Sequence, residues 1–139
     1  MRILRVDHVG IAVEDLEAAA EVLSLLFPGH QAHVEEVPQQ GVRTTSYPAG
    51  ETALEFLESI ADEGPVGRYL KKRGNGIHHI ALQVDDLEEA LSELEKRGIP
   101  LIDRKLRPGA GGKRIAFLHP RGTGGILIEL CQSPPAIER

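Results

Sequence analysis

Two histidine–glutamate pairs are the residues of this sequence whose types and positions could do chemistry. His8 and His79, like Glu55 and Glu129, stand among apolar neighbours and recur at nearly the same separation along the chain. A carboxylate in a buried strand is costly unless it is paired or bound to a metal. Two imidazoles and two carboxylates suit a borderline divalent ion such as Co²⁺, Ni²⁺, Mn²⁺, Zn²⁺ or Fe²⁺. Four such ligands would leave two positions of an octahedron for a substrate that chelates through two oxygens.

Each of these residues also has an ordinary interpretation. His8 alone would more often be a hydrogen-bonded histidine, and Glu55 alone the solvent-facing half of an alternating strand. The matching positions of all four residues favour a metal site instead. His78 precedes His79, and strand alternation points it the other way, so we interpret it as structural or as a residue that supports a metal ligand.

The chain repeats itself, which is the main evidence for this metal site. Residues 7–19 read DHVGIAVEDLEAA and residues 78–90 read HHIALQVDDLEEA. A second match follows, in which YPAG at 47–50 precedes Leu54-Glu55-Phe56 and HPRG at 119–122 precedes Ile128-Glu129-Leu130. Two matches in the same order indicate a duplicated module.

Both copies predict the same elements. An alternating strand leads into a helix that Asp15 or Asp86 caps. The predicted apolar faces are Leu16, Ala19, Leu23 and Leu26 in the first helix, and Leu87, Ala90, Leu91 and Leu94 in the second. Three strands follow, near 30–37, 42–48 and 52–58 in the first copy and near 100–104, 113–119 and 125–131 in the second.

The predicted fold class is therefore α+β, with two paired βαβββ modules in a single domain spanning 1–139. Module 1 covers about 3–60, and module 2 covers about 76–132. A linker helix at about 65–74 starts at Pro65 and is closed by Gly74. A Pro-rich tail, 133–139, follows. Pairing the two modules would close a cleft in which the repeated histidines and glutamates face each other.

Composition excludes several classes of function. The net charge of −5 gives no long-range attraction to nucleic acid. Cys131 is the single cysteine, so no disulfide within the chain and no multi-thiolate zinc site can form. No apolar run approaches the ~20 residues that cross a bilayer, and the first residues lack a signal-peptide pattern. We expect no membrane partner and a cytoplasmic location.

The two modules resemble the vicinal-oxygen-chelate superfamily, and most of all the methylmalonyl-CoA epimerases. The resemblance is carried by ILRVDHVGIAV at 3–13, QGV at 40–42, GIHHI at 76–80 and GAGGKRIAFLHPRGTGGILIELCQ at 109–132. It implies interconversion of the two C2 epimers of methylmalonyl-CoA. Carried over by residue, the metal ligands fall on His8, Glu55, His79 and Glu129. Some epimerases have a glutamate, proposed as an acid–base residue, where this chain has Thr44.

Chemistry and resemblance together give a mechanism. The C2 hydrogen lies between a thioester and a carboxylate, so its removal forms an enolate that a metal can stabilise. Glu129 is the predicted base. The acid on the opposite face is left open between water, Glu55 and another side chain of the cleft. One divalent ion per subunit is expected, with Co²⁺ as first choice and Ni²⁺, Mn²⁺ or Zn²⁺ as alternatives.

An isolated basic segment, 104–114, is the predicted contact for the anionic acyl-CoA substrate. It holds five basic residues and no acid, around a Gly-rich turn whose N–H groups suit anions. Lys113 and Arg114 are the predicted substrate-binding residues, together with His119, which would either contact the substrate carboxylate or only pack against its neighbours. A solvated loop is the competing interpretation. The superfamily resemblance further implies a homodimer.

Three rivals share the fold. A glyoxalase I (lactoylglutathione lyase) has the same ligand pattern, but typically has aromatic residues in its first helix. A non-catalytic small-molecule binding protein usually lacks the ligands that this chain has. An extradiol dioxygenase would need two histidines and one glutamate, usually in a longer chain.

Overall fold

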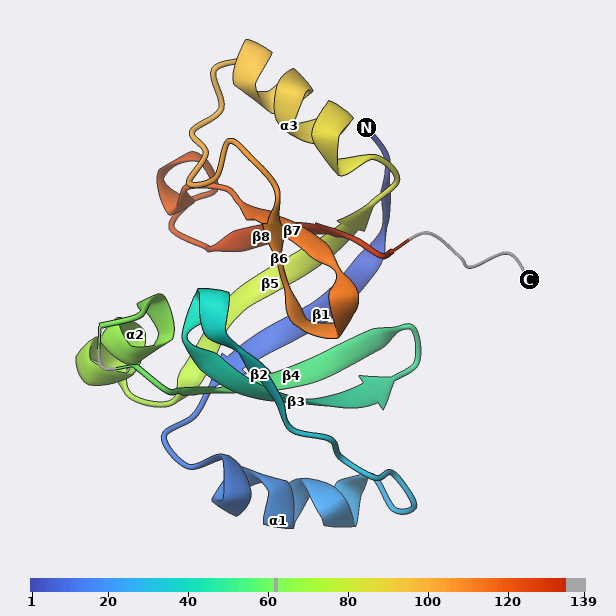
Figure 1. Cartoon of the computed structure of the whole chain (residues 1–139), viewed down its shortest axis with the longest axis vertical. Coiled ribbons are helices and arrows are strands. Elements are labelled where there is room, and N and C mark those ends of the chain that lie inside the picture. The colour runs from blue at the N-terminus through green and yellow to red at the C-terminus, as the bar shows by residue number, and fades with distance from the viewer. Residues whose placement is uncertain (62, 135–139) are drawn as a thin grey trace. The chain divides into compact units, whose positions relative to one another are not determined.

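The computed structural model describes residues 1–61 and 63–134, which form two compact units (Figure 1). The N-terminal unit is His8–His78, and the C-terminal unit joins Met1–Asp7 to the chain from His79 onward. The division falls inside two strands, so the first strand begins in one unit and ends in the other. The tail predicted at 133–139 lies outside the described residues from 135 onward. Within the described residues, none of the helices has the length and apolar character that crossing a membrane requires.

The N-terminal unit has the predicted βαβββ order, followed by a helix. Its half-sheet has the strand order β2-β3-β4-β1, in which β1 and β4 are parallel and the other neighbours antiparallel. The elements are β1 (Ile3–Ala12), α1 (Leu16–Leu26), β2 (Glu35–Val37), a 3-10 helix (Pro38–Gln40), β3 (Val42–Ala49), β4 (Thr52–Ser59) and α2 (Pro65–Arg73).

The C-terminal unit repeats this topology with order β6-β7-β8-β5 and a parallel β5–β8 pair. The α+β fold with two βαβββ modules is therefore confirmed. The elements are β5 (Gly76–Val84), α3 (Leu87–Lys96), β6 (Arg107–Pro108), a 3-10 helix (Ala110–Gly112), β7 (Arg114–Phe117), a 3-10 helix (Pro120–Gly122) and β8 (Ile128–Gln132).

Each main helix begins at the aspartate that the sequence predicts. The Asp15 side chain accepts a hydrogen bond from the N–H of Ala18 at 3.1 Å, and Asp86 accepts one from Glu89 at 3.0 Å. These bonds satisfy one of the free N–H groups of each first turn. The linker helix is also confirmed, since α2 runs from Pro65 to Arg73 and is followed by Gly74 with a φ of 72°.

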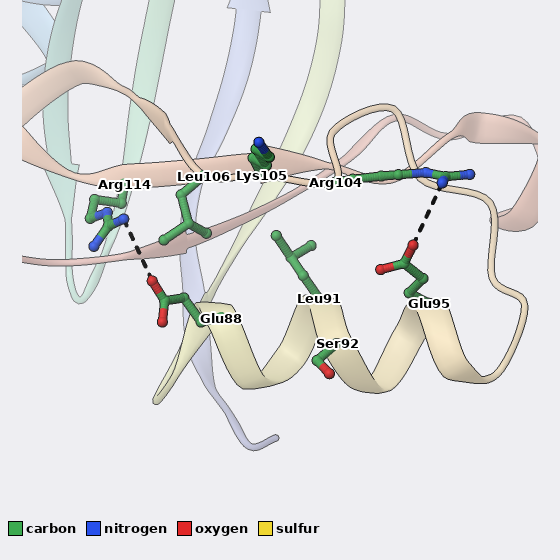
Figure 2. A pocket seen from close by; sticks show the side chains of 8 residues that line it. All are labelled: Glu88, Leu91, Ser92, Glu95, Arg104, Lys105, Leu106 and Arg114. Atoms are coloured by element: carbon green, nitrogen blue, oxygen red, sulfur yellow. Dashed lines mark ion pairs between the residues drawn. The ribbon is translucent and has the colours of Figure 1, made fainter.

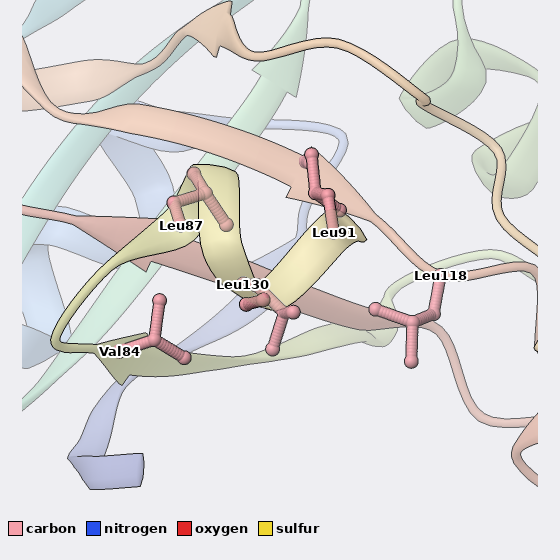
Figure 3. Close-up of a cluster of buried hydrophobic side chains, with 7 residues drawn as sticks. Val84, Leu87, Leu91, Leu118 and Leu130 are labelled. Atoms are coloured by element: carbon pink, nitrogen blue, oxygen red, sulfur yellow. The ribbon is translucent and has the colours of Figure 1, made fainter. Parts of the chain in front are cut away.

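An aliphatic cluster binds α3 to one side of its half-sheet (Figure 3). Leu87 and Leu91 of the helix pack on Leu130 and Leu118, and all four are buried. The α3 stripe is confirmed, because Ala90 is also buried and Leu94 packs against the cluster. We call this side of the half-sheet the α3 face and the opposite side the ligand face.

Three predictions about elements are wrong in detail. The strand predicted near 30–37 is confined to β2, Glu35–Val37. Leu26 is 67 % exposed, because α1 ends there and Phe27 turns inward, 5.4 Å from the Tyr47 ring. In the predicted strand at 100–104, only Leu101 forms a bridge, to Leu118. The short strand of the C-terminal unit is β6, further along the chain.

Candidate active site and metal centre

The N-terminal unit places His8 beside Glu55. Strands β1 and β4 are parallel, and Gly10, two residues after the histidine, is the register partner of Glu55. The His8 Nε2 and Glu55 Oε1 atoms lie 3.8 Å apart, and both residues are buried. The sequence-predicted pair of this module is therefore brought together.

The C-terminal unit places His79 beside Glu129 in the same way. Ala81, two residues after the histidine, is the register partner of Glu129 across the parallel β5–β8 pair. The His79 Nε2 and Glu129 Oε2 atoms lie 3.7 Å apart, and each residue is 3 % exposed. The ring of Phe117 packs edge-on against His79, with centroids 5.6 Å apart. The duplicated sequence thus produces duplicated geometry.

The donor atoms of both pairs fit a divalent ion. Nitrogen and oxygen ligands each lie ~2.1 Å from a zinc-like ion. A histidine nitrogen and a glutamate oxygen that are 3.7 or 3.8 Å apart can therefore coordinate the same ion. A buried carboxylate without compensation would be costly. The residues present therefore fit a metal of the borderline class, and each unit supplies one imidazole and one carboxylate.

Thr44 and Ser46 of β3 border the first pair. Ser46 is the register partner of Glu55, and Thr44 is the partner of Leu57, two residues further along β4. Alternation puts all four side chains on the same side of the N-terminal half-sheet. Thr44 is buried, and its hydroxyl does not accept a proton at neutral pH, so the acid–base role cannot be transferred to it.

Arg114 lies apart from the His79–Glu129 pair. It ion-pairs with Glu88 of α3 at 3.8 Å (Figure 2). Arg104 ion-pairs with Glu95 of the same helix at 3.6 Å. Both arginines line a pocket beside α3, on the α3 face. Along β7, Arg114 alternates with Ile115, which belongs to the apolar cluster on the ligand face.

Lys113 and His119 each have a partner within the C-terminal unit. The Lys113 Nζ lies 2.5 Å from Oδ2 of the buried Asp7. The Nδ1 of His119 accepts a hydrogen bond from the N–H of Arg121 at 3.0 Å, which caps a 3-10 helix. These contacts give each residue a structural role, and their substrate roles remain predictions.

Cys131 and His78 have pKa values that burial shifts away from the ordinary range. Burial raises the pKa of the Cys131 thiol to about 12, and the negative charges of Asp7 and Glu129 add to the shift. Burial lowers the pKa of His78 to about 4. The His78 ring packs edge-on against Tyr69, with centroids 5.1 Å apart, in agreement with its interpretation as structural.

Sequence reasoning missed the environment of Asp7 and the position of Arg107. No role is assigned to Asp7 from the sequence, and Arg107 is only one of the five basic residues of the segment 104–114. Asp7 contacts Lys113, 106 positions away. The Arg107 guanidinium lies over the Phe117 ring, 5.5 Å from its centroid. Tertiary register brings these residues together, and no local pattern signals it.

The comparisons with known proteins agree on one family. The sequence model of the Glyoxalase/Bleomycin resistance protein/Dioxygenase superfamily matches residues 7–117. The uncharacterized protein YqjC of Bacillus subtilis is 42 % identical, over 92 % of this chain and 91 % of its own. The human mitochondrial methylmalonyl-CoA epimerase is 35 % identical, over 93 % of this chain and 74 % of its own.

A solved structure gives the same result. Streptomyces coelicolor methylmalonyl-CoA epimerase in complex with 2-nitronate-propionyl-CoA superposes with a TM-score of 0.86 and 32 % identity. The match covers 99 % of this chain and all of that one. Sequence, topology and the paired histidines and glutamates therefore lead to one conclusion: the chain belongs to the glyoxalase/bleomycin resistance protein/dioxygenase superfamily and, within it, to the methylmalonyl-CoA epimerase family of enzymes.

Proposed function

We propose that the protein interconverts the two C2 epimers of methylmalonyl-CoA. The observation that carries the proposal is the pair of buried His–Glu contacts, one in each unit, at 3.8 and 3.7 Å. The relatives named methylmalonyl-CoA epimerase, and the one solved with an acyl-CoA analogue, support the choice of substrate.

We propose that His8, Glu55, His79 and Glu129 together hold one divalent ion per subunit, for which Co²⁺ is our first choice. When bound, the ion supplies Lewis-acid stabilisation of the negative charge that develops on the substrate oxygens. The buried, largely apolar setting of the four residues strengthens such electrostatic effects, because little water screens them.

Glu129 acts as the base in this proposal. It takes the C2 proton, which is acidic because it lies between a thioester and a carboxylate, and the resulting enolate is reprotonated from the opposite face. Thr44 occupies the position at which some family members have a glutamate, so we assign the second proton transfer to water or to Glu55.

The CoA end is proposed to lie along the basic segment. A pocket of about 320 Å³ is lined by Arg107, Lys113 and Arg114 with Gly109 and Gly112, and no acid lines it. Gly109 allows this turn to approach β7, because a Cβ there would lie 2.7 Å from Cγ2 of Ile115. Glycine-rich turns also expose N–H groups to anions.

His119 is proposed to contact the substrate carboxylate. We further propose a cytoplasmic homodimer. The family resemblance supports the homodimer.

The decisive experiment is deuterium exchange at C2 of methylmalonyl-CoA in D₂O, run beside an assay of hemithioacetal isomerisation. Exchange that depends on added metal, without hemithioacetal turnover, is the expected result. Turnover of the hemithioacetal alone would assign the chain to glyoxalase I chemistry. Tight acyl-CoA binding without either reaction would make it a binding protein.

A further inference from the structure

Within the segment 104–114, Arg107 is the basic residue whose side chain lies on the ligand face of the C-terminal half-sheet, over the ring of Phe117. It is the register partner of Ile115, which is in turn the partner of Cys131, so these side chains share one side of the C-terminal half-sheet. Its guanidinium carbon lies 5.5 Å from the centroid of Phe117, a residue that pairs directly with Glu129.

Asp103 holds this guanidinium in place from one side. Its Oδ1 lies 3.2 Å from Arg107 Nε, while its Oδ2 accepts a hydrogen bond from the N–H of Phe117 at 2.9 Å. The Asp103 side chain is only 13 % exposed, so one buried carboxylate fixes both the arginine and the aromatic ring beneath it.

The guanidinium retains capacity for a second anion. It has five N–H donors in a planar fork, and Asp103 is its only ion-pair partner among the residues that the structure describes. Its Nε is buried without a hydrogen bond of good geometry to any described residue. The side chain as a whole is 34 % exposed, so a ligand can reach its outer edge.

Three of the other four basic residues of the segment pair with carboxylates outside it. Arg104 and Arg114 pair with glutamates of α3, and Lys113 pairs with Asp7. The Phe117 ring contacts both the Arg107 guanidinium and the His79 imidazole. Arg107 is thus a positive charge one aromatic ring away from the His79–Glu129 pair.

We infer that Arg107 recognises the carboxylate of a malonyl-type acyl-CoA and thereby positions the substrate for reaction at C2. A guanidinium fork binds a carboxylate through two parallel hydrogen bonds, and the aromatic face below excludes water from them. The phosphates of CoA are many bonds away from the thioester, whereas the carboxylate is attached to C2. The inference rests on the proposed function, to which it adds a residue that selects acidic over neutral acyl chains.

The test compares two ligands that differ by this carboxylate. Dissociation constants of malonyl-CoA and propionyl-CoA are measured by calorimetry on the metal-loaded protein. Losing one partner of a charge pair typically costs 2–5 kcal/mol, so Arg107→Met should weaken malonyl-CoA binding on the order of 10²-fold. The dissociation constant of propionyl-CoA should change far less, because this ligand lacks the carboxylate that pairs with the guanidinium.

Two further variants sharpen the result. Arg107→Lys keeps the charge but loses the fork, so it should restore part of the malonyl-CoA affinity. Arg97→Met is the matched control, because Arg97 is an exposed arginine at the end of α3 that pairs only with Glu93 among the described residues. It should leave both dissociation constants unchanged. Circular dichroism melting confirms that each variant is folded.

The inference is overturned if Arg107→Met weakens both ligands equally, which would make Arg107 a contact for the CoA moiety. It is also overturned if neither affinity changes. Deuterium exchange at C2 by the parent protein separates these outcomes from a failure of the proposed function. Loss of malonyl-CoA selectivity in a protein that catalyses no exchange would retain the carboxylate contact and reject only the epimerase assignment.

Discussion

At the scale of single residues, Glu129 is the side chain with two assigned roles. An amide oxygen can still coordinate a metal, whereas an amide accepts no proton at neutral pH. Glu129→Gln should therefore retain some metal and lose more turnover than metal. Removing a general base typically lowers the rate ~10²–10⁴-fold. The measurement is kcat beside metal content per chain.

Glu55→Gln is the matched control for this prediction. Glu55 forms the equivalent contact in the other unit, 3.8 Å from His8, and it is not the proposed first base. If water carries out the second proton transfer, the effect of Glu55→Gln on turnover should be far milder, and a loss as large as that of Glu129→Gln would assign this transfer to Glu55. Parent-like turnover by Glu129→Gln at full metal occupancy would reduce Glu129 to a ligand. Thr44→Glu, which restores the carboxylate of some epimerases, tests the position of the second acid.

Cys131 should be almost inert towards alkylating agents. The thiolate is the reactive form, and burial raises the pKa of this thiol to about 12. At pH 8 the thiolate fraction, and hence labelling by iodoacetamide, should be lower than in the unfolded chain by roughly 10³-fold. Mass spectrometry with and without denaturant measures it, and rapid labelling of the folded protein would contradict the burial.

The same thiol gives a pH dependence of known sign. The folded thiol retains its proton well above its unfolded pKa of 9.0. As the pH rises past that value, only the unfolded chain loses the proton, so the free energy of unfolding should fall. Cys131→Ala should flatten the stability profile above pH 9. A profile that is unchanged by the substitution would contradict the shift.

Contacts between side chains can be predicted from the sequence where a pattern of residues is repeated. The repeated His–Glu pairs were predicted from their matching positions, and both contacts are present within their units. The Asp7–Lys113 pair and the Arg107–Phe117 stack were not predicted. They depend on how strands distant in sequence are aligned, and a single aspartate or arginine has no periodicity to indicate its partner.

At the scale of elements, the helix caps give a stability prediction. Asp86 accepts a hydrogen bond from the N–H of Glu89 at the start of α3. Asp86→Ala should lower the free energy of unfolding by ~1 kcal/mol, and Asp86→Asn should largely preserve it. Urea unfolding measures both. An alanine variant as stable as the parent would mean that another group caps α3.

The basic turn between β6 and β7 gives a prediction about substrate affinity. Neutralising Lys113 and Arg114 should raise KM for methylmalonyl-CoA, with a larger effect at low salt because screening is weaker there. A truncated thioester without phosphates should be affected much less. Steady-state kinetics on both substrates at two ionic strengths tests this, and equal losses on both would indicate a structural turn.

A control for Lys113 must separate its effect on the substrate from its effect on Asp7, its buried partner. Asp7 also pairs with Arg5 at 3.6 Å, so removing the lysine alone takes away one of the cations that compensate this buried carboxylate and should itself destabilise the protein. The double change Asp7→Asn with Lys113→Met keeps the pair neutral. If this double variant raises KM as much as Lys113→Met alone does, the charge of the lysine acts on the substrate.

The boundaries of helices and strands were predicted well where a capping residue or a proline defines them, and poorly elsewhere. The aspartate caps and the Pro65 start of α2 have local causes, and the structure confirms them. The strand predicted at 100–104 lacked such a cause. Leu101 packs on the α3 cluster instead, whereas Ile102 is exposed, so hydrophobicity alone could not distinguish a partly packed loop from a strand.

At the scale of the whole molecule, the two units should depend on each other for metal binding. If both His–Glu pairs hold one ion, metal-loaded protein contains about one ion per chain, and ion binding raises the melting temperature. His79→Ala should sharply lower metal content, as should His8→Ala. Elemental analysis measures it.

His33→Ala serves as the control for these variants. His33 is an exposed histidine of the N-terminal unit and should keep the full metal content. Unchanged metal retention in both His8→Ala and His79→Ala would remove the proposed site.

The division of β1 between two units sets an order for folding during synthesis. Arg2 donates its N–H to Asp85, 83 positions later, and Asp7 pairs with Lys113, 106 positions later. At a synthesis rate of ~5–20 residues per second, roughly 5–20 s pass between the incorporation of Asp7 and that of its partner Lys113. The N-terminal unit is complete once His78 has emerged. The C-terminal unit must await its last strand and then recruit some of the oldest residues of the chain, so a protease should find it open for longest during translation.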